Sequence, residues 1–245
     1  MTGTKRKCCN LAGIVIVMNA EQLRTKMALN ASYLDEIDRI PYEPRAIANF
    51  EALCLWTMID HCRPQILIES GVCRGRSTVL LCEAALKFGV EHVYAFDLDP
   101  EFEEYTRTKL GGYENVSYEI GDSAQKIQVL SKNLENKSVG LFLDGPKQGK
   151  PLRNLMQSIS RLPNVAFIAS HDCHPKRRTR EDFSNGYKDY FDNKKHHFLY
   201  TDRNFWSGQD LNAKLRLEMN EAYPEALYTL NDIAYHMGII YRENV

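Results

Sequence analysis

The 245-residue sequence lacks an excess of charge of either sign, a paired-cysteine pattern and a long apolar run. Its 31 lysines and arginines balance 32 aspartates and glutamates, which argues against a surface built for nucleic acid. Its seven cysteines are odd in number and scattered, so they exclude a simple disulfide framework and favour a reducing, cytoplasmic setting. The apolar run at 11–18 is too short to cross a bilayer, so we expect no transmembrane segment.

Hydrophobic residues make up 44% of the chain, enough for one α/β domain with a sizeable core. The first twenty residues stand apart, because the basic stretch 5–7 precedes the apolar run and loosely imitates a signal peptide. Cys8 and Cys9 could also be acylated. The cysteine usage argues against secretion, so we expect a leader at 1–20 and a single domain at 21–245.

The stretch 65–100 is the part around which the chain is organised. The apolar run 66–68 predicts a short buried strand, with Glu69 at the point where this strand ends. Gly71 and Gly75 follow, and they permit a tight turn and close approach of a ligand to the backbone. The sequence therefore predicts a strand that opens into a glycine-rich turn.

A helix and a second strand complete this unit. The apolar spacing from Ser77 predicts a helix that Gly89 closes, and the run 93–96 predicts a strand that ends in Asp97. An α/β fold binds a nucleoside with this order of strand, glycine turn, helix and second strand. The acid after the second strand, here Asp97, then binds the ribose hydroxyls.

Two common nucleotide motifs are missing from this unit. The dinucleotide fingerprint needs three glycines, and Cys73 and Arg76 stand where the second and third would be. The phosphate loop needs Gly-Lys-Ser or Gly-Lys-Thr, and neither occurs in the chain. These absences count against a nicotinamide-dependent oxidoreductase and against a phosphate-loop protein.

Three further apolar runs, at 116–120, 139–143 and 165–169, predict the remaining parallel strands. Each is followed closely by an acid, so five acids recur at strand ends along the chain: Glu69, Asp97, Asp122, Asp144 and Asp172. Ligands of open parallel sheets bind at that edge. Asp122 can contact a ligand, cap the helix that we expect at 123–134, or do both.

The pattern E-x-G-x-x-x-G-x-S from Glu69 to Ser77 resembles motif I of the class I S-adenosylmethionine methyltransferases. The resemblance covers roughly 45–172 and is to the catechol and caffeoyl-CoA O-methyltransferase branch and the cephalosporin-hydroxylase-like and macrocin-type sugar O-methyltransferases. It implies a Rossmann-like α/β fold, with a seven-stranded, mostly parallel sheet in the order 3-2-1-4-5-7-6 and helices on both faces. It also implies S-adenosyl-L-methionine as cofactor, bound by Glu69, Gly71, Gly75, Ser77, Asp97, Asp122 and Ser123.

The catechol branch ends its fourth strand in Asp-x-x-Lys, and Asp144 and Lys147 match that spacing. After the fifth strand that family has an acid and an amide, where this chain has His171 and Asp172. The resemblance implies catalytic roles for Lys147, Asp144 and His171. It also implies that Asp144, His171 and Asp172 hold a divalent metal, Mg²⁺ or Mn²⁺.

Other roles for these residues remain open. Magnesium prefers oxygen ligands, whereas histidine suits manganese or zinc better, so His171 departs from the family pattern. His171 could instead be a metal-free general base, and Lys147 could pair with Asp144 or simply be solvated. Cys173 lacks a convincing partner for a nucleophilic role.

The flanking regions are expected to cover the site. Helices at 21–40 and 45–62 are predicted as N-terminal cover helices, and 174–214 as a substrate-lid insert that starts with a solvated basic loop at 176–180. The resemblance therefore implies an O-methyltransferase that acts on a small molecule, and a sugar or an anion could be its acceptor. Nucleic acid is disfavoured, and related enzymes are often homodimers. The alternatives are a metal-free methyltransferase acting on nitrogen or a macromolecule, and a non-catalytic nucleotide-binding relative.

Overall fold

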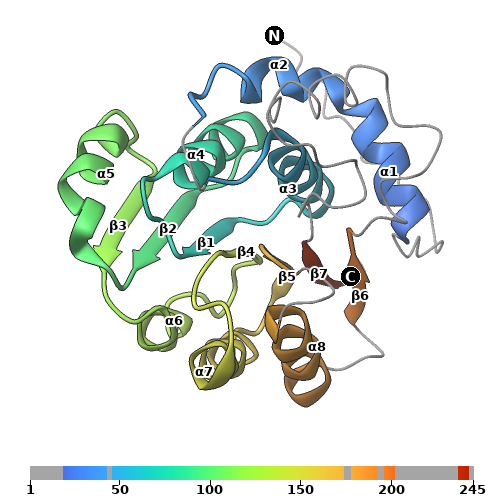
Figure 1. Ribbon diagram of the computed structural model, residues 1–245, viewed down its shortest axis with the longest axis vertical. Helices are drawn as coiled ribbons and strands as arrows, with labels where there is room; N and C mark the ends of the chain where they lie inside the picture. The colour runs from blue at the N-terminus through green and yellow to red at the C-terminus, as the bar shows by residue number, and fades with distance from the viewer. Residues whose placement is uncertain (1–18, 43–45, 174–177, 192–195, 202–236, 243–245) are drawn as a thin grey trace, which may run out of the picture.

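The computed structural model describes residues 19–42, 46–173, 178–191, 196–201 and 237–242 (Figure 1). Most of the expected leader and much of the expected lid insert lie outside these ranges. No helix in the described ranges is both long enough and apolar enough to cross a membrane.

The sheet has seven strands in the order β3-β2-β1-β4-β5-β7-β6, as the resemblance implied. β5 and β6 each pair with β7 in antiparallel fashion, and the other neighbours are parallel. The strands are β1 (Ile66–Ser70), β2 (His92–Asp97), β3 (Val116–Ile120), β4 (Val139–Leu143), β5 (Val165–Ser170), β6 (His196–Tyr200) and β7 (Gly238–Arg242).

The pairing register of β1, β4 and β5 places the carboxyl ends of these strands side by side. Ser70, the last residue of β1, is opposite Leu143 in β4, and Leu143 is opposite Ser170 in β5. Residues that follow these strands therefore emerge together at one edge. Every residue of β1 and of β4 is buried, as expected for parallel strands covered by helices on both faces.

In the part of the chain that the structure describes, five helices lie on one face of the sheet (Figure 1). Their shared core includes Trp56 and Phe142, which are almost fully buried. The helices are α1 (Ala20–Leu29), α2 (Leu34–Ile37), α3 (Asn49–Cys62), α4 (Arg76–Phe88) and α5 (Glu103–Leu110), with short 3₁₀ turns at Ala31–Tyr33 and Pro100–Phe102. The expected single helix at 21–40 is interrupted, because α1 ends at Leu29 and a 3₁₀ turn follows at Ala31–Tyr33.

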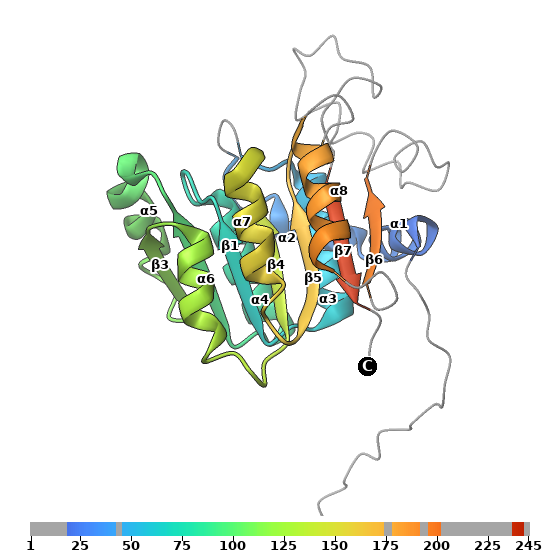
Figure 2. The ribbon, with the colours of Figure 1, turned by 90° about the horizontal axis from the view of Figure 1, so that it is seen from below.

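Among the described residues, three helices cover the other face, namely α6 (Ser123–Ser131), α7 (Gly149–Ile159) and α8 (Arg178–Tyr190) (Figure 2). The basic stretch was expected to be a solvated loop, and this is wrong for its described part, which begins α8. Phe183 is fully buried, and Gly186 lies so close to Met156 that an added Cβ would be 3.0 Å from its Cγ. This packing against α7 makes α8 a layer of the fold.

Candidate active site

The turn after β1 fits tightly against the turn after β4. Gly71 has φ +88°, and a Cβ there would lie 2.6 Å from the Gly145 nitrogen and 2.8 Å from the Asp144 carbonyl carbon. Gly75 has φ +75° at the start of α4, where a Cβ would lie 3.0 Å from Thr106 Cγ2. Both predicted turn glycines therefore occupy backbone that only glycine adopts easily, and both permit close packing.

Glu69 ends up fully buried beneath this turn. Its Oε2 accepts a hydrogen bond from the Thr78 hydroxyl, whereas its Oε1 is buried with no hydrogen-bond partner among the described residues. Burial raises the pKa of Glu69 to about 8, although hydrogen bonds from Ser77 and Thr78 oppose the rise. An unsatisfied buried carboxyl oxygen is costly, and such atoms are typical of sites where a ligand supplies the missing donor.

Asp97 braces the glycine turn from the neighbouring strand. Its Oδ2 accepts hydrogen bonds from the backbone N–H of Val72 at 2.7 Å and of Cys73 at 2.6 Å. Its Oδ1 accepts one from the Asp99 N–H at 2.9 Å. The acid predicted to bind a ribose therefore also holds the conformation of the turn.

Asp122 and Ser123 lie at the end of β3, on the same edge. Asp122 caps α6 by accepting a hydrogen bond from the Ala124 N–H at 2.8 Å, which confirms the helix-cap alternative. The Ser70 hydroxyl donates to the Ser123 hydroxyl at 2.7 Å, so the ends of β1 and α6 are tied together. A contact of either residue with a ligand stays a prediction.

The predicted reacting residues meet where β4 and β5 end. Lys147 Nζ donates a hydrogen bond to Asp144 Oδ1 and lies 3.0 Å from Asp172 Oδ2 and 3.1 Å from His171 Nδ1. His171 Nδ1 is 2.7 Å from Asp144 Oδ1. Asp172 has φ +61°, a strained left-handed backbone conformation of the kind found at functional sites.

A fifth residue, Glu51 of α3, completes this cluster and was missed from the sequence. Its Oε2 lies 3.3 Å from His171 Nε2 and accepts a hydrogen bond from the Ala48 N–H at 3.0 Å. The residue is 2% exposed, and its Oε1 has no hydrogen-bond partner among the described residues. In the sequence Glu51 is one acid within the cover helix predicted at 45–62. Acids are common near the start of helices, so nothing there indicates a contact with His171, 120 residues later.

The charges of this cluster support one another. Burial lowers the pKa of His171, but the attraction of Glu51 and the hydrogen bonds to Asp144 and Glu51 outweigh it and raise the pKa to about 10. Burial likewise lowers the pKa of Lys147, and Asp144 and Asp172 raise it further than burial lowers it. Burial raises the pKa of Asp144, and His171 and Lys147 reverse that shift to a net lowering. At neutral pH His171 is therefore an imidazolium that offers N–H groups to both acids.

The predicted metal ligands do come together, but around a lysine. Asp144, His171 and Asp172 converge on the Lys147 ammonium nitrogen. Among the described residues no three histidine, cysteine, aspartate or glutamate side chains are placed to hold a metal ion. A metal role for these three residues stays a prediction.

Arg76 connects the glycine turn to the first helices and was also missed. Its side chain is 2% exposed, and its guanidinium donates to the carbonyl oxygens of Pro41, at 3.1 Å, and Ile47. It also donates to Asn49 Oδ1 at 2.6 Å. The residue that replaces a fingerprint glycine therefore fixes the chain just before α3, the helix that carries Glu51.

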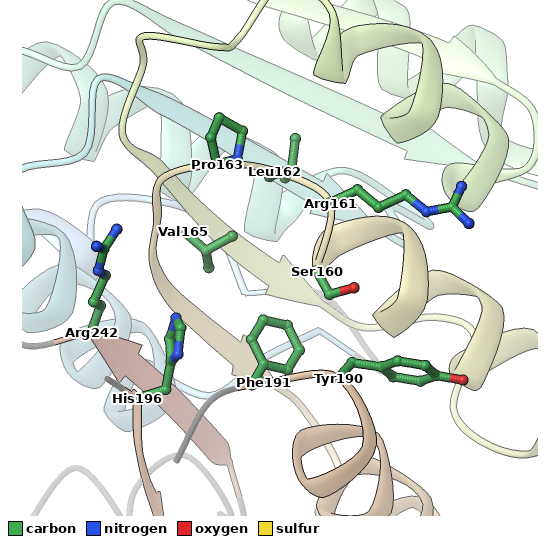
Figure 3. Close-up of a pocket in the computed structure, with 9 residues that line it drawn as sticks. All are labelled: Ser160, Arg161, Leu162, Pro163, Val165, Tyr190, Phe191, His196 and Arg242. Atoms are coloured by element: carbon green, nitrogen blue, oxygen red, sulfur yellow. The ribbon is translucent and has the colours of Figure 1, made fainter. Parts of the chain in front are cut away.

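A cavity of about 320 Å³ lies at the opposite edge of the sheet, where β5 and β6 begin (Figure 3). Its lining includes Ser160, Arg161, Leu162, Pro163, Val165, Tyr190, Phe191, His196 and Arg242. None of the predicted site residues is among them, so this cavity is separate from the cluster at the carboxyl ends of the strands.

Comparison with known proteins gives the same fold. Residues 68–173 match the family model described as a methyltransferase domain, and no curated protein sequence matches the chain. A structure of the O-methyltransferase from Bacillus cereus in complex with SAH aligns at 12% identity with a TM-score of 0.55, covering 94% of this chain and 94% of that one.

Two further solved structures are similar. The SAH-bound methyltransferase from Podospora anserina is 11% identical with a TM-score of 0.55, covering 95% of this chain and 100% of that one. An O-methyltransferase from Streptomyces achromogenes involved in tomaymycin synthesis, in complex with SAM, is 11% identical with a TM-score of 0.53. That alignment covers 89% of this chain and 90% of the other. At such identities the likeness to these structures shows the fold alone.

Proposed function

We propose that this chain, whose residues 68–173 match a methyltransferase domain, transfers a methyl group from S-adenosylmethionine to a hydroxyl oxygen of a small molecule. One observation carries the proposal. The glycine turn holds a buried Glu69 carboxyl oxygen without a donor, and the cluster of Asp144, Lys147, His171 and Asp172 lies at the same edge of the sheet. The buried thiols of Cys54, Cys82 and Cys173 are free, which supports a reducing, cytoplasmic setting.

The first half of the strand-end edge would hold the donor. Glu69 offers a buried carboxyl oxygen to a cationic group, and Gly71 and Gly75 keep the turn open for close approach. Asp97 would bind the ribose hydroxyls while its other contacts hold the turn, and Asp122 and Ser123 would lie by the adenine. Ser77 hydrogen-bonds to Glu69 from the first turn of α4 and so orients that carboxyl group.

The bound donor supplies an electrophilic methyl group, and the chain's own residues prepare the acceptor. A hydroxyl group becomes a good nucleophile when its proton leaves and the remaining oxyanion is stabilised. The proton would pass to the Asp172 carboxylate, because Lys147 and His171 already hold their own protons. Lys147 presents an ammonium that can stabilise the oxyanion, and Asp144 and Asp172 hold Lys147 in place while His171 pairs with Asp144. Glu51 fixes the ring of His171 from the opposite side.

A divalent metal was also predicted, and the arrangement of its expected ligands does not fit one. The carboxylate oxygens that would bind it point to Lys147 Nζ, and the His171 Nδ1 that would bind it lies 2.7 Å from Asp144 Oδ1, so the expected ligands are already paired within the chain. No step of the proposed reaction is therefore assigned to a metal ion.

Calorimetric titration of S-adenosylmethionine into the purified full-length chain tests the proposal. We expect the wild type to bind, and Asp97→Ala to bind at least about tenfold more weakly, because it loses the ribose ligand and the brace of the turn. Asp99→Ala is the matched control, since the Asp99 side chain caps the following 3₁₀ turn and its backbone N–H, which Asp97 uses, remains. No binding by the wild type, with NAD binding in its place, would sink the methyltransferase proposal.

A further inference from the structure

The cluster at the ends of β4 and β5 has the composition of a cation site. Two carboxylates and a ring nitrogen from separate strand ends face a common point, and such donor sets bind divalent ions when that point is vacant. Here the point is occupied by the nitrogen of Lys147. The lysine reaches it from the turn that Asp144 begins, only three residues further along the chain.

We propose that the Lys147 ammonium is the resident cation of this site, and that it takes the position a divalent metal would need. The inference rests on the proposed function only for what this cation does, which is to stabilise the acceptor oxyanion. The occupation of this position depends only on the side chains that surround it, so it can be tested without a methyl donor or acceptor.

Geometry and charge both support this assignment. Asp144 and Asp172 are largely buried, with side chains 18% and 20% exposed, so each needs a cationic partner. Lys147 serves both at once, with its charged end between them and its whole side chain 36% exposed. A divalent ion placed among the same oxygens would lie within a few ångströms of the ammonium, where like charges repel strongly.

The assignment predicts that the metal site is latent and that removing one side chain exposes it. In Lys147→Met the side chain keeps most of its length and loses its charge, which leaves Asp144 and Asp172 without the cation that joins them. The vacated position then has the carboxylates of Asp144 and Asp172 within reach, and carboxylate oxygens suit Mn²⁺. The wild type has no such vacancy.

Titration of Mn²⁺ into the full-length chain, followed by the electron paramagnetic resonance signal of free Mn²⁺, tests the proposal. We expect no stoichiometric binding by the wild type. Lys147→Met should bind one equivalent, with a Kd at least about tenfold below that of any weak Mn²⁺ binding by the wild type. Adding Asp144→Asn to Lys147→Met should abolish that binding. Lys137→Met is the matched control, because it removes a lysine that pairs with Glu91 at 2.6 Å outside this cluster, and it should bind like the wild type.

Two results would overturn the inference. One is stoichiometric Mn²⁺ binding by the wild type that Asp144→Asn removes, since the lysine would then yield its position to a metal. The other is a Lys147→Met protein that shows a wild-type circular dichroism spectrum and melts cooperatively, yet binds no Mn²⁺. Neither result depends on S-adenosylmethionine binding, so the proposed function stands or falls separately.

Discussion

At the scale of single residues, burial strongly favours the neutral form of the Glu69 carboxyl group, which lies beneath the glycine turn. Its pKa is raised from 4.5 to about 8, chiefly by desolvation. Between these two values the unfolded chain has lost this proton while the folded chain still holds it. The free energy of unfolding should therefore fall as pH rises from about 4.5 to about 8, because the folded state binds more protons.

Glu69→Gln should remove this part of the pH dependence. The amide keeps the shape of the side chain and cannot ionise, so its free energy of unfolding should change less between pH 5 and pH 8, by on the order of 3 kcal/mol. Urea unfolding at several pH values measures the difference. His171 also contributes in this range, because its pKa is 6.5 in the unfolded chain and about 10 in the folded one, but it is present in both proteins and so cancels in the comparison. Parallel pH profiles for the two proteins would show that Glu69 ionises normally.

Gly71 is the residue at which the two turns touch. Gly71→Ala would place a methyl group 2.6 Å from a backbone nitrogen of the β4 turn, on a backbone with φ +88°. Backbone cannot move aside as a side chain can, so we expect a loss of about 2–4 kcal/mol in the free energy of unfolding and weaker cofactor binding.

Gly112→Ala is the control for this substitution. A Cβ at Gly112 would meet nothing within 4 Å, and its φ lies outside the region that favours glycine. Its free energy of unfolding should stay within about 0.5 kcal/mol of the wild type. Equal denaturation midpoints for the two variants would contradict the close approach of the turns.

At the scale of elements, Arg76 joins the start of α4 to the chain that leads into α3. Arg76→Met would leave acceptors on Pro41, Ile47 and Asn49 without this donor, and of these three hydrogen bonds the one to Ile47 is buried. The loss of a buried hydrogen bond costs about 1–3 kcal/mol, and the effect should be local to the first turn of α3. Amide hydrogen exchange should become faster there than in α7, on the other face of the sheet.

Arg74→Met provides the comparison for this helix connection. Arg74 is exposed and its guanidinium lies over the Phe102 ring, 4.9 Å from the centroid, so it contacts neither α3 nor its approach. Exchange in α3 should match the wild type in this variant. Faster exchange in both variants, or in neither, would show that Arg76 does not fix the helix.

The elements that the sequence predicts well are those whose signal is local. The strands at 116–120 and 139–143 are reproduced residue for residue. The run 139–143 is a continuous buried apolar segment, as is typical of a parallel strand inside a sheet, whereas 116–120 is the edge strand β3, in which apolar and polar residues alternate. The glycine turn and the strand-end acids follow from them, since parallel strands present their carboxyl ends at one edge. Gly89 closes α4 in the left-handed conformation, as a C-terminal glycine usually does.

What the sequence does not show depends on contacts between distant segments. Glu51 looks like an acid in the first turn of a helix, and only the packing of α3 beside β5 brings it to His171. α8 is charged enough to be taken for a loop, and its helix is fixed by Phe183 and by Gly186 against α7. The position of Lys147 between two acids is likewise set by the register of β4 and β5.

At the scale of the whole molecule, one sheet separates two apolar cores. The core on the α3 and α4 face contains Trp56, and the core on the α6 to α8 face contains Phe183. Side chains alternate between the faces along each strand, so Ile68 belongs to one core and Leu67 to the other. Neither core can lose its packing without exposing strands that the other core needs, and we expect the two to unfold together.

Tryptophan fluorescence can test this coupling. In a Trp206→Phe protein the fluorescence comes from Trp56 alone, which is 1% exposed and reports only the α3 and α4 face. We expect its urea transition to coincide with that of far-ultraviolet circular dichroism, which reports the helices of both faces, as in a two-state transition. Phe183→Ala, which opens a cavity on the other face, should lower both midpoints together, with a loss of about 3–5 kcal/mol. A shift of the circular dichroism midpoint alone would mean that the two faces unfold separately, and that the strand-end site joins two units that can part.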